Sequence, residues 1–142
     1  MNGEQYSATC VKLREYFQNK ERVVLALLFG SFGTADEHRM SDIDVAVLLQ
    51  HDVPLMDELK LSAELSILLE RDDVDLLMLR NAPVHIAHRA LATGRIVFER
   101  DRLQAANFVE SVLNSYRDFG YRLRQIDREF DEKLREEYLD IE

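Results

Sequence analysis

Two aspartates separated by a single residue are the first feature of this sequence that could do chemistry. Asp42 and Asp44 open an apolar run. Alternate side chains of a strand project from the same face, so the two carboxylates would lie together. Carboxylates this close repel each other and resist desolvation. A divalent cation relieves that repulsion, and Mg²⁺ prefers carboxylate oxygens together with substrate phosphates. The pair therefore predicts a magnesium site at the start of a strand.

A Gly-Ser pair precedes the aspartates and could contact a phosphate. Gly30 and Ser31 directly follow the apolar run 23–29. Glycine lets backbone approach a phosphate closely, and serine offers a hydroxyl and an N–H. A lone Gly-Ser is most often a turn, and a lone Asp-x-Asp is often a solvated strand end. The combination is more specific: a strand, Gly-Ser, the ten residues 32–41, then Asp-x-Asp entering a second strand.

A third carboxylate stands inside a later apolar segment. Residues 73–79 read DVDLLML, and Asp75 is a charge within this expected strand. Such a charge needs a partner. Taken alone, Asp75 would be a strand-edge acid paired with an arginine. With Asp42 and Asp44 upstream, a site shared by the three carboxylates is favoured, and Asp73 is the alternative third member.

Strand and helix patterns alternate along the part of the chain that must position these residues. His85 and His88 lie three residues apart in an expected helix. Without a third ligand they are expected to be surface or satisfied polar residues. The inner positions expected for the second helix are Leu55, Leu59, Leu65, Leu68 and Leu69. The expected elements are helix 5–19, strands 23–29 and 42–49, helix 55–69, strand 73–79, a helix from about 81 to 93 capped by Gly94, and strand 95–99.

From Asp101 onward a single long helical pattern follows. Thirty-eight helical residues would span about 57 Å, whereas a compact domain of this size has a radius of gyration near 14 Å. Either the helix breaks near Gly120 or part of its apolar stripe protrudes. Packing on the domain and a partner or self-association surface remain alternatives. Residues 127–142 carry eight acids against three bases. The apolar seam consists of Val112, Tyr116, Phe119, Leu123, Ile126 and Phe130, and Leu134 and Tyr138 roughly continue it.

The length, net charge and cysteine content of the chain limit the number of domains and the classes of function that it can have. The 142 residues fit one domain, 1–142, with a core at about 20–100 and a helical extension at about 101–140. The net charge of −9 argues against a general nucleic-acid binder, and no direct DNA binding is expected. Cys10 is the only cysteine, which excludes an intrachain disulfide. No signal peptide or membrane-spanning run is recognisable, so a cytoplasmic location is expected.

Residues 29–49 carry a resemblance to a known family. Gly30-Ser31, ten residues, then Asp42-Ile43-Asp44 resembles the pattern of the nucleotidyltransferase (DNA polymerase beta-like) superfamily. The chain is similar in particular to the minimal nucleotidyltransferases of the MNT type, the antitoxins of HEPN/MNT toxin–antitoxin pairs, over roughly residues 20–100. The resemblance implies an α+β nucleotidyltransferase fold: a small mixed β-sheet flanked by helices, with the long C-terminal helix added.

The resemblance also implies a reaction and a partner. Asp42, Asp44 and Asp75 would be catalytic and would bind two Mg²⁺ ions, while Gly30 and Ser31 would bind the phosphates of ATP. AMP would pass from ATP to a hydroxyl, with tyrosine the expected acceptor, of a cognate HEPN ribonuclease toxin and so neutralise it. A small-molecule or RNA acceptor, or an antitoxin that acts by binding alone, are the alternatives. A homo-oligomer, or a hetero-oligomer with the toxin, is left open.

One departure concerns the phosphates. Many relatives carry a basic residue shortly after Gly-Ser, where this chain has residues 33–35, Gly-Thr-Ala. The nearest positive charge in the interval is Arg39. Phosphate charge would then be neutralised more by metal, by backbone N–H groups, or by an arginine such as Arg89 or Arg95.

Overall fold

The structure, a computed structural model, describes residues 3–29 and 42–139. Its order of helices and strands is the order expected from the sequence, with one short 3-10 helix, η1, in addition. The elements are α1 (Gly3–Gln18), β1 (Val23–Phe29), β2 (Ile43–Leu49), α2 (Leu55–Leu69), β3 (Val74–Met78), η1 (Leu79–Asn81), α3 (Val84–Thr93), β4 (Arg95–Glu99) and α4 (Arg102–Tyr138).

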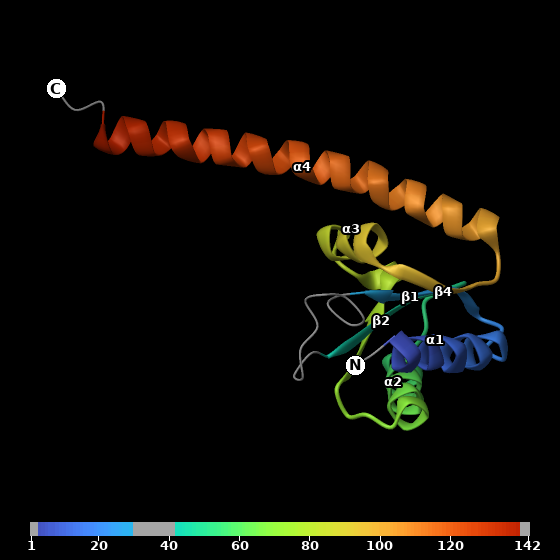
Figure 1. The fold of residues 1–142 in the computed structure, drawn as a ribbon. Coiled ribbons are helices and arrows are strands. Elements are labelled where there is room, and N and C mark those ends of the chain that lie inside the picture. The colour runs from blue at the N-terminus through green and yellow to red at the C-terminus, as the bar shows by residue number, and fades with distance from the viewer. Residues whose placement is uncertain (1–2, 30–41, 140–142) are drawn as a thin grey trace.

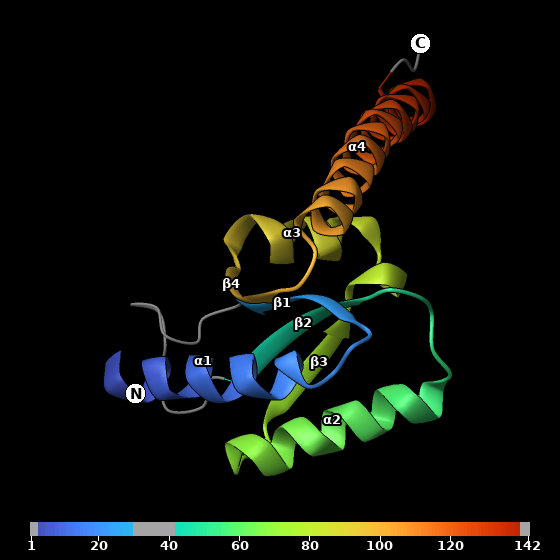
Figure 2. The same ribbon diagram turned by 90° about the vertical axis from the view of Figure 1, so that its right-hand side faces the viewer.

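The strands form one mixed sheet in the order β3-β2-β1-β4. β1 pairs antiparallel with β2 and with β4, whereas β2 and β3 are parallel. Helices α1 and α2 cover one face of the sheet, and α3 with the first part of α4 covers the other (Figures 1 and 2). The expected α+β architecture, a small mixed sheet flanked by helices with a long C-terminal helix, is confirmed.

Because both faces are covered, the central strands are apolar throughout, and their alternate residues enter different cores. On β2, the side chains of Ile43, Val45 and Val47 join Leu13 and Phe17 of α1. Ala46 and Leu48 face the other way and join residues of α3 and α4. Asp44, two residues before Ala46, therefore shares the α3 side of the sheet.

The expected inner face of α2 is only partly right. Leu65 and Leu69 are buried, and Leu68 packs against the same core. Leu55 and Leu59 are wrong, since they are 67% and 53% exposed. They lie in the first turns of α2, whereas the α2 leucines that contact the core, Leu61, Leu65, Leu68 and Leu69, come from its middle and end.

Gly94 is required by close packing. Its N–H donates to the Ala90 carbonyl oxygen at 2.8 Å and caps α3. A Cβ at this position would collide with that same oxygen, and it would also crowd the Leu28 carbonyl. No side chain fits, so the residue type follows from the space between α3 and β1.

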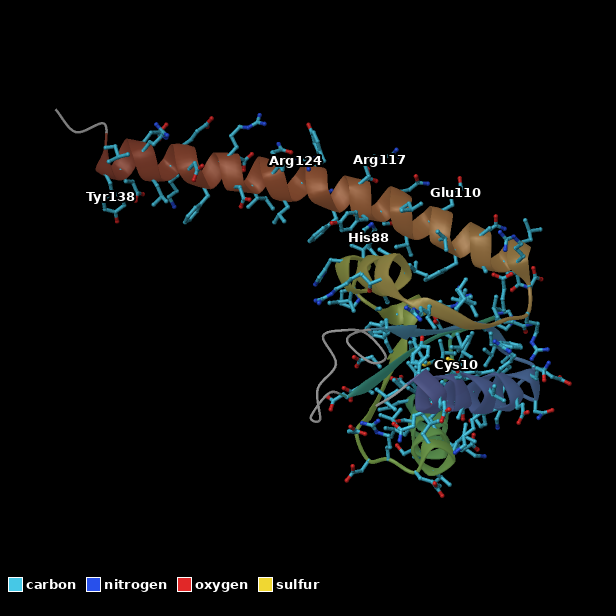
Figure 3. All side chains as sticks on the ribbon, viewed as in Figure 1. Cys10, His88, Glu110, Arg117, Arg124 and Tyr138 are labelled. Atoms are coloured by element: carbon cyan, nitrogen blue, oxygen red, sulfur yellow. The ribbon has the colours of Figure 1, made fainter. Side chains whose placement is uncertain are left out.

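α4 is one unbroken helix, so the alternative of a break near Gly120 is wrong. Ala105 and Val112 of α4 are buried. His88 of α3 stacks on Tyr116, with ring centroids 3.6 Å apart (Figure 3), and His85 of α3 stacks on Phe119 at 5.7 Å. From residue 121 to 139 every residue is exposed, and this half of the helix extends well beyond the sheet (Figure 1). The apolar stripe therefore protrudes. None of the helices in the described ranges has the length and apolarity to cross a membrane.

Candidate active site

The register of β2 on β3 places two of the predicted carboxylates side by side. The Cα atoms of Asp44 and Asp75 are direct partners across these parallel strands. Both side chains project to the α3 side, because Leu77, two residues beyond Asp75, packs in the core on that side. The pairing extends to the strand ends, where the Ile43 N–H donates to the Asp73 carbonyl oxygen at 3.0 Å.

Asp42 completes the group. It is exposed and lies just before β2, on the same side of the strand as Asp44 by alternation. Its carboxylate reaches the side chain of Asp75 closely enough for a hydrogen bond between the two groups. Three carboxylates from two neighbouring strands therefore meet at one end of the sheet.

Their proximity changes their acidity. Burial, followed by the nearby charges of Asp75 and Asp42, raises the pKa of the Asp44 carboxyl to about 6. The pKa of Asp75 is also raised, first by partial desolvation of its carboxyl, although the residue is largely exposed, and then by Asp42. Among the residues that the structure describes, none of the charges acting on either group is positive. The described part of the cluster thus concentrates negative charge.

Such a donor set fits a hard divalent cation. Oxygen ligands on carboxylates that repel one another are what Mg²⁺ binds, and a cation would reverse the electrostatic cost. Within the described residues, no group of three or more His, Cys, Asp or Glu side chains is already arranged to hold a metal ion. The carboxylates are therefore near one another, but their oxygen atoms do not converge on one metal position.

Asp73, the alternative third member, has a different environment. Its carboxylate accepts two hydrogen bonds from the guanidinium of Arg71, Nε to Oδ1 at 2.7 Å and Nη2 to Oδ2 at 2.5 Å. This pairing holds the pKa of Asp73 below its usual value. Asp73 is a neutralised carboxylate at the strand entrance, whereas Asp75 faces Asp42 and Asp44.

The phosphate-binding part of the prediction lies outside the described residues: Gly30, Ser31, residues 33–35 and Arg39. β1 ends at Phe29, whose Cα partner is Asp44, so the chain leaves β1 beside the carboxylates. Of the two arginines considered for phosphate charge, Arg95 lies over the Tyr6 ring of α1 at 5.4 Å, on the sheet face opposite Asp44. Arg89 is exposed on α3, which covers the face that Asp44 shares.

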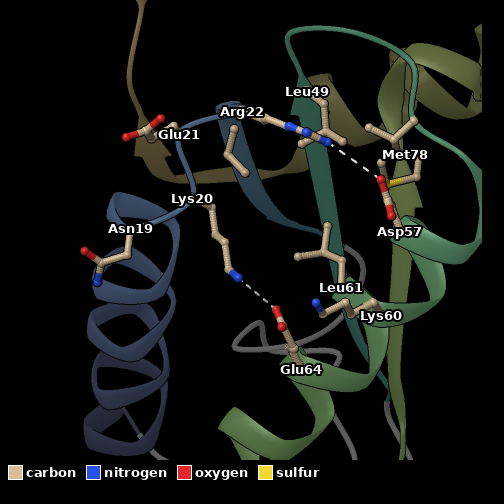
Figure 4. Close-up of a pocket in the computed structure, with 12 residues that line it drawn as sticks. Asn19, Lys20, Glu21, Arg22, Leu49, Asp57, Lys60, Leu61, Glu64 and Met78 are labelled. Atoms are coloured by element: carbon tan, nitrogen blue, oxygen red, sulfur yellow. Dashed lines mark ion pairs between the residues drawn. The ribbon is translucent and has the colours of Figure 1, made fainter.

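A cavity of about 510 Å³ lies at the other end of the sheet, between the end of α1 and α2 (Figure 4). Its lining includes Val23 and Leu49, which pair with each other at the end of β1 and β2 far from Asp44. Two ion pairs lie along it. Lys20 Nζ is 3.1 Å from a Glu64 carboxylate oxygen, and Arg22 Nη1 is 3.6 Å from an Asp57 carboxylate oxygen. This cavity is separate from the three carboxylates.

Interactions of Arg100 and of the two histidines were not found from the sequence. Arg100 binds four backbone carbonyls around the end of α1, and the two histidines stack on α4. The i, i+3 spacing of His85 and His88 opposite aromatic positions of the later helix was an available signal. No local signal marks Arg100, because its partners lie about eighty residues away.

Comparison with known families matches the part of the chain that holds the sheet to a described domain. The family model "Polymerase beta, Nucleotidyltransferase" matches residues 11–103. Protein adenylyltransferase MntA of Shewanella oneidensis is 34% identical over 77 residues. That alignment covers 54% of this chain and 55% of MntA, so the match spans about half the length of this relative.

Solved structures share the fold at lower sequence identity. A toxin–antitoxin structure with AMP-PNP superposes with a TM-score of 0.69 at 23% identity, covering 92% of this chain and 98% of that one. A structure of a tri-AMPylated Shewanella oneidensis HEPN toxin in complex with MNT antitoxin gives a TM-score of 0.69 at 21% identity, covering 87% and 97%. The whole architecture, including most of the chain beyond the matched family domain, therefore has close structural counterparts.

Proposed function

The chain belongs to the polymerase beta nucleotidyltransferase family, and from this premise we propose that it transfers AMP from ATP to a tyrosine hydroxyl of a cognate HEPN ribonuclease toxin. The modification would neutralise the toxin, which makes the chain an antitoxin. The name of the relative MntA, a protein adenylyltransferase, supports the reaction. The AMPylated HEPN toxin bound to an antitoxin of the same fold supports the choice of partner.

The carboxylate cluster is the observation that carries the proposal. Asp44 and Asp75 are register partners on adjacent strands, and Asp42 reaches Asp75. A structural role would require a positive partner of the kind that Asp73 has in Arg71. The charges that act on Asp44 and Asp75 are negative and raise their pKa values. This electrostatic cost is expected at a functional site.

Asp42, Asp44 and Asp75 would hold two Mg²⁺ ions. When bound, these ions neutralise the triphosphate and stabilise charge on the attacking and leaving oxygens. The protein side of the site supplies placement: β2 and β3 fix the carboxylates on a rigid sheet, so little reorganisation is needed during the reaction. Gly30 and Ser31 would bind the β- and γ-phosphates, which form the leaving group.

The reaction itself is a substitution at phosphorus. The acceptor hydroxyl oxygen bonds to the α-phosphorus of ATP, and the bond from that phosphorus to the bridging oxygen of the β-phosphate breaks. Pyrophosphate leaves with the bonding electron pair. The hydroxyl proton would go to the Asp75 carboxylate.

A comparison of two neighbouring aspartates tests this assignment. Asp75→Asn keeps the shape of the side chain but removes its charge, so we expect AMP transfer to fall by at least about a hundredfold, as for other acid–base groups. Mg·ATP binding through Asp42, Asp44 and Ser31 should largely persist. Asp73→Asn is the matched control, and its transfer rate should stay within about threefold of the parent, because Arg71 alone loses a partner.

The assay combines the chain, its HEPN partner, Mg²⁺ and ATP labelled at the α-phosphate, and intact mass reports the number of AMP groups on the partner. Calorimetric titration of Mg·ATP measures binding separately. If Asp75→Asn transferred AMP at the parental rate while Asp73→Asn did not, the roles of the two residues would be reversed. If the parent labelled RNA or a small molecule but never the toxin, the acceptor would be wrong while the chemistry stood.

A further inference from the structure

The distal half of α4 carries an apolar surface that no described part of the chain covers. We call it the distal stripe: Leu123, Ile126, Phe130, Leu134 and Tyr138, which are 46%, 59%, 60%, 38% and 66% exposed. Steps of three and four residues place them on one side of a helix. The stripe continues the line of Tyr116 and Phe119, which stack on the histidines of α3. The same helix face is thus an established packing surface at one end and is uncovered at the other.

The exposed area of the molecule is large for its mass. The chain exposes 9976 Å², whereas a compact monomer of this mass would expose about 7,600 Å². A standard protein–protein interface takes only about 800 Å² from each partner. The protruding helix therefore offers more than enough surface for a specific contact.

Charge is segregated along this half of the helix. Residues 117–128 contain four arginines and two aspartates, a net charge of +2. Residues 129–138 contain five acids and two bases, a net charge of −3. Arg117 and Arg124, both labelled in Figure 3, are exposed, and together with His85 of α3 they line a hollow beside α4. The helix thus presents a basic segment followed directly by an acidic one, with the apolar stripe running through both.

We propose that the distal stripe pairs with the same stripe of a second copy of this chain, with the two helices antiparallel. A two-fold axis near Phe130 places the basic segment 117–128 of each copy against the acidic segment 129–138 of the other, twice. The same axis sets Ile126 level with Leu134 of the second copy, so apolar residues face apolar residues. A parallel pair would instead bring two acidic segments together and would be repelled. This assembly does not depend on the nucleotidyl transfer proposed above.

The first test is the mass of the full-length chain in solution, measured by light scattering over a hundredfold range of concentration. The parent is expected to reach twice the mass of one chain. Phe130→Asp places a charge at the centre of the stripe and should raise the dimer dissociation constant by at least about tenfold. Tyr121→Asp is the control: Tyr121 is 66% exposed, but it lies two residues from Leu123 and so on another side of the helix. That variant should dimerise like the parent.

The second test is orientation. In a background with Cys10→Ser, which removes the only cysteine, Asp131→Cys lies next to the axis and should form a disulfide with its own copy on oxidation. Leu139→Cys lies far from the axis and should not. Equal cross-linking of both variants would mean a parallel pair and would overturn the proposal.

Two further outcomes would also overturn it. One is a parent chain that stays monomeric throughout the concentration range. The other is a monomeric chain in which Phe130→Asp abolishes binding to the HEPN partner, because the stripe would then belong to that partner. Misfolding is not a concern for these α4 variants, since residues 121–139 are exposed and take no part in either core.

Discussion

The Asp44 carboxyl has the clearest electrostatic conflict among the carboxylates of the cluster. Its pKa is raised from the ordinary 3.8 to about 6 by burial, by Asp75 and by Asp42, in that order. A carboxyl with a raised pKa binds more protons in the folded than in the unfolded protein, so stability falls as pH rises from 3.8 through about 6. Above about pH 6, Asp44 is charged in both states, and its unfavourable effect on the free energy of unfolding of the metal-free protein is greatest.

Asp44→Asn should therefore stabilise the metal-free protein at pH 8. Asparagine cannot ionise, so the variant avoids the stability that the parent loses when Asp44 becomes charged. We expect the Tm to rise by roughly 2–4 °C. That figure is discounted because Asp44 is partly exposed and solvent screens its charge. At pH 3.5 the gain should vanish, since the aspartate is then protonated in both states. Thermal unfolding of the parent and the variant in EDTA, at pH 8 and at pH 3.5, measures the Tm difference under each condition. A variant less stable than the parent at pH 8 would show that Asp44 makes a favourable interaction instead.

The choice between two candidate residues shows where sequence reasoning stops. Alternation put Asp73 and Asp75 on one face, which left both as candidates for the third carboxylate. Only the conformation of Arg71, two residues before Asp73, separates them, because it neutralises Asp73 and leaves Asp75 facing Asp42. A local ion pair of this kind has no signature in the alternation of residues.

At the scale of elements, predictions succeeded where a segment is apolar on every side. The bounds of β1 match because Val23–Phe29 is buried on both faces, so the apolar run ends where the strand ends. The predicted inner face of α2 was partly wrong because the leucines of this helix are distributed around it rather than confined to one side. Which leucines are buried there depends on where the sheet ends, and that is a property of the assembled fold rather than of the helix.

One arginine joins two elements that are distant in sequence. Arg100, directly after β4, donates from Nη2 to the carbonyl oxygens of Phe17 at 2.9 Å and Gln18 at 3.0 Å. It also donates from Nη2 to that of Lys20 at 3.2 Å and from Nε to that of Val23 at 3.0 Å. These carbonyls belong to the end of α1 and the turn into β1, where a helix leaves acceptors unsatisfied and the dipole favours a cation. Arg100 thereby fixes α1 against the sheet.

Arg100→Leu should lower the free energy of unfolding by about 1.5–3 kcal/mol, the range for hydrogen bonds that involve a charged group. Arg22→Leu is the matched control. Arg22 makes an exposed ion pair with Asp57 at 3.6 Å, and its loss should cost no more than about 0.5 kcal/mol. Urea unfolding of both variants gives the comparison. Equal losses would mean that the carbonyls at the end of α1 are satisfied by water once Arg100 is removed.

The whole molecule consists of a sheet with a core on each face and a helix, α4, that extends beyond it. α4 has 37 residues and is about 56 Å long. Its residues in the core end at Val112, and its stacking contacts with α3 end at Phe119. The sequence predicted the long helix and the mismatch in size but left open whether the helix breaks or protrudes. Helical periodicity is the same in both cases, and only the positions of His85 and His88 show where the packing ends.

Truncation after Gln125 should therefore leave the folded core intact. The described residues that it removes, 126–139, are exposed in the monomer and lie outside both cores, so at a concentration where the parent is monomeric the Tm should change by no more than about 2 °C. Truncation after Ser111 is the contrasting case, because it removes buried Val112 together with the aromatic partners of His85 and His88. That shorter chain should lose at least about 5 °C. A comparable loss in the chain ending at Gln125 would mean that the distal half of α4 folds back onto its own domain in solution, and dimer formation through it would then have no free surface.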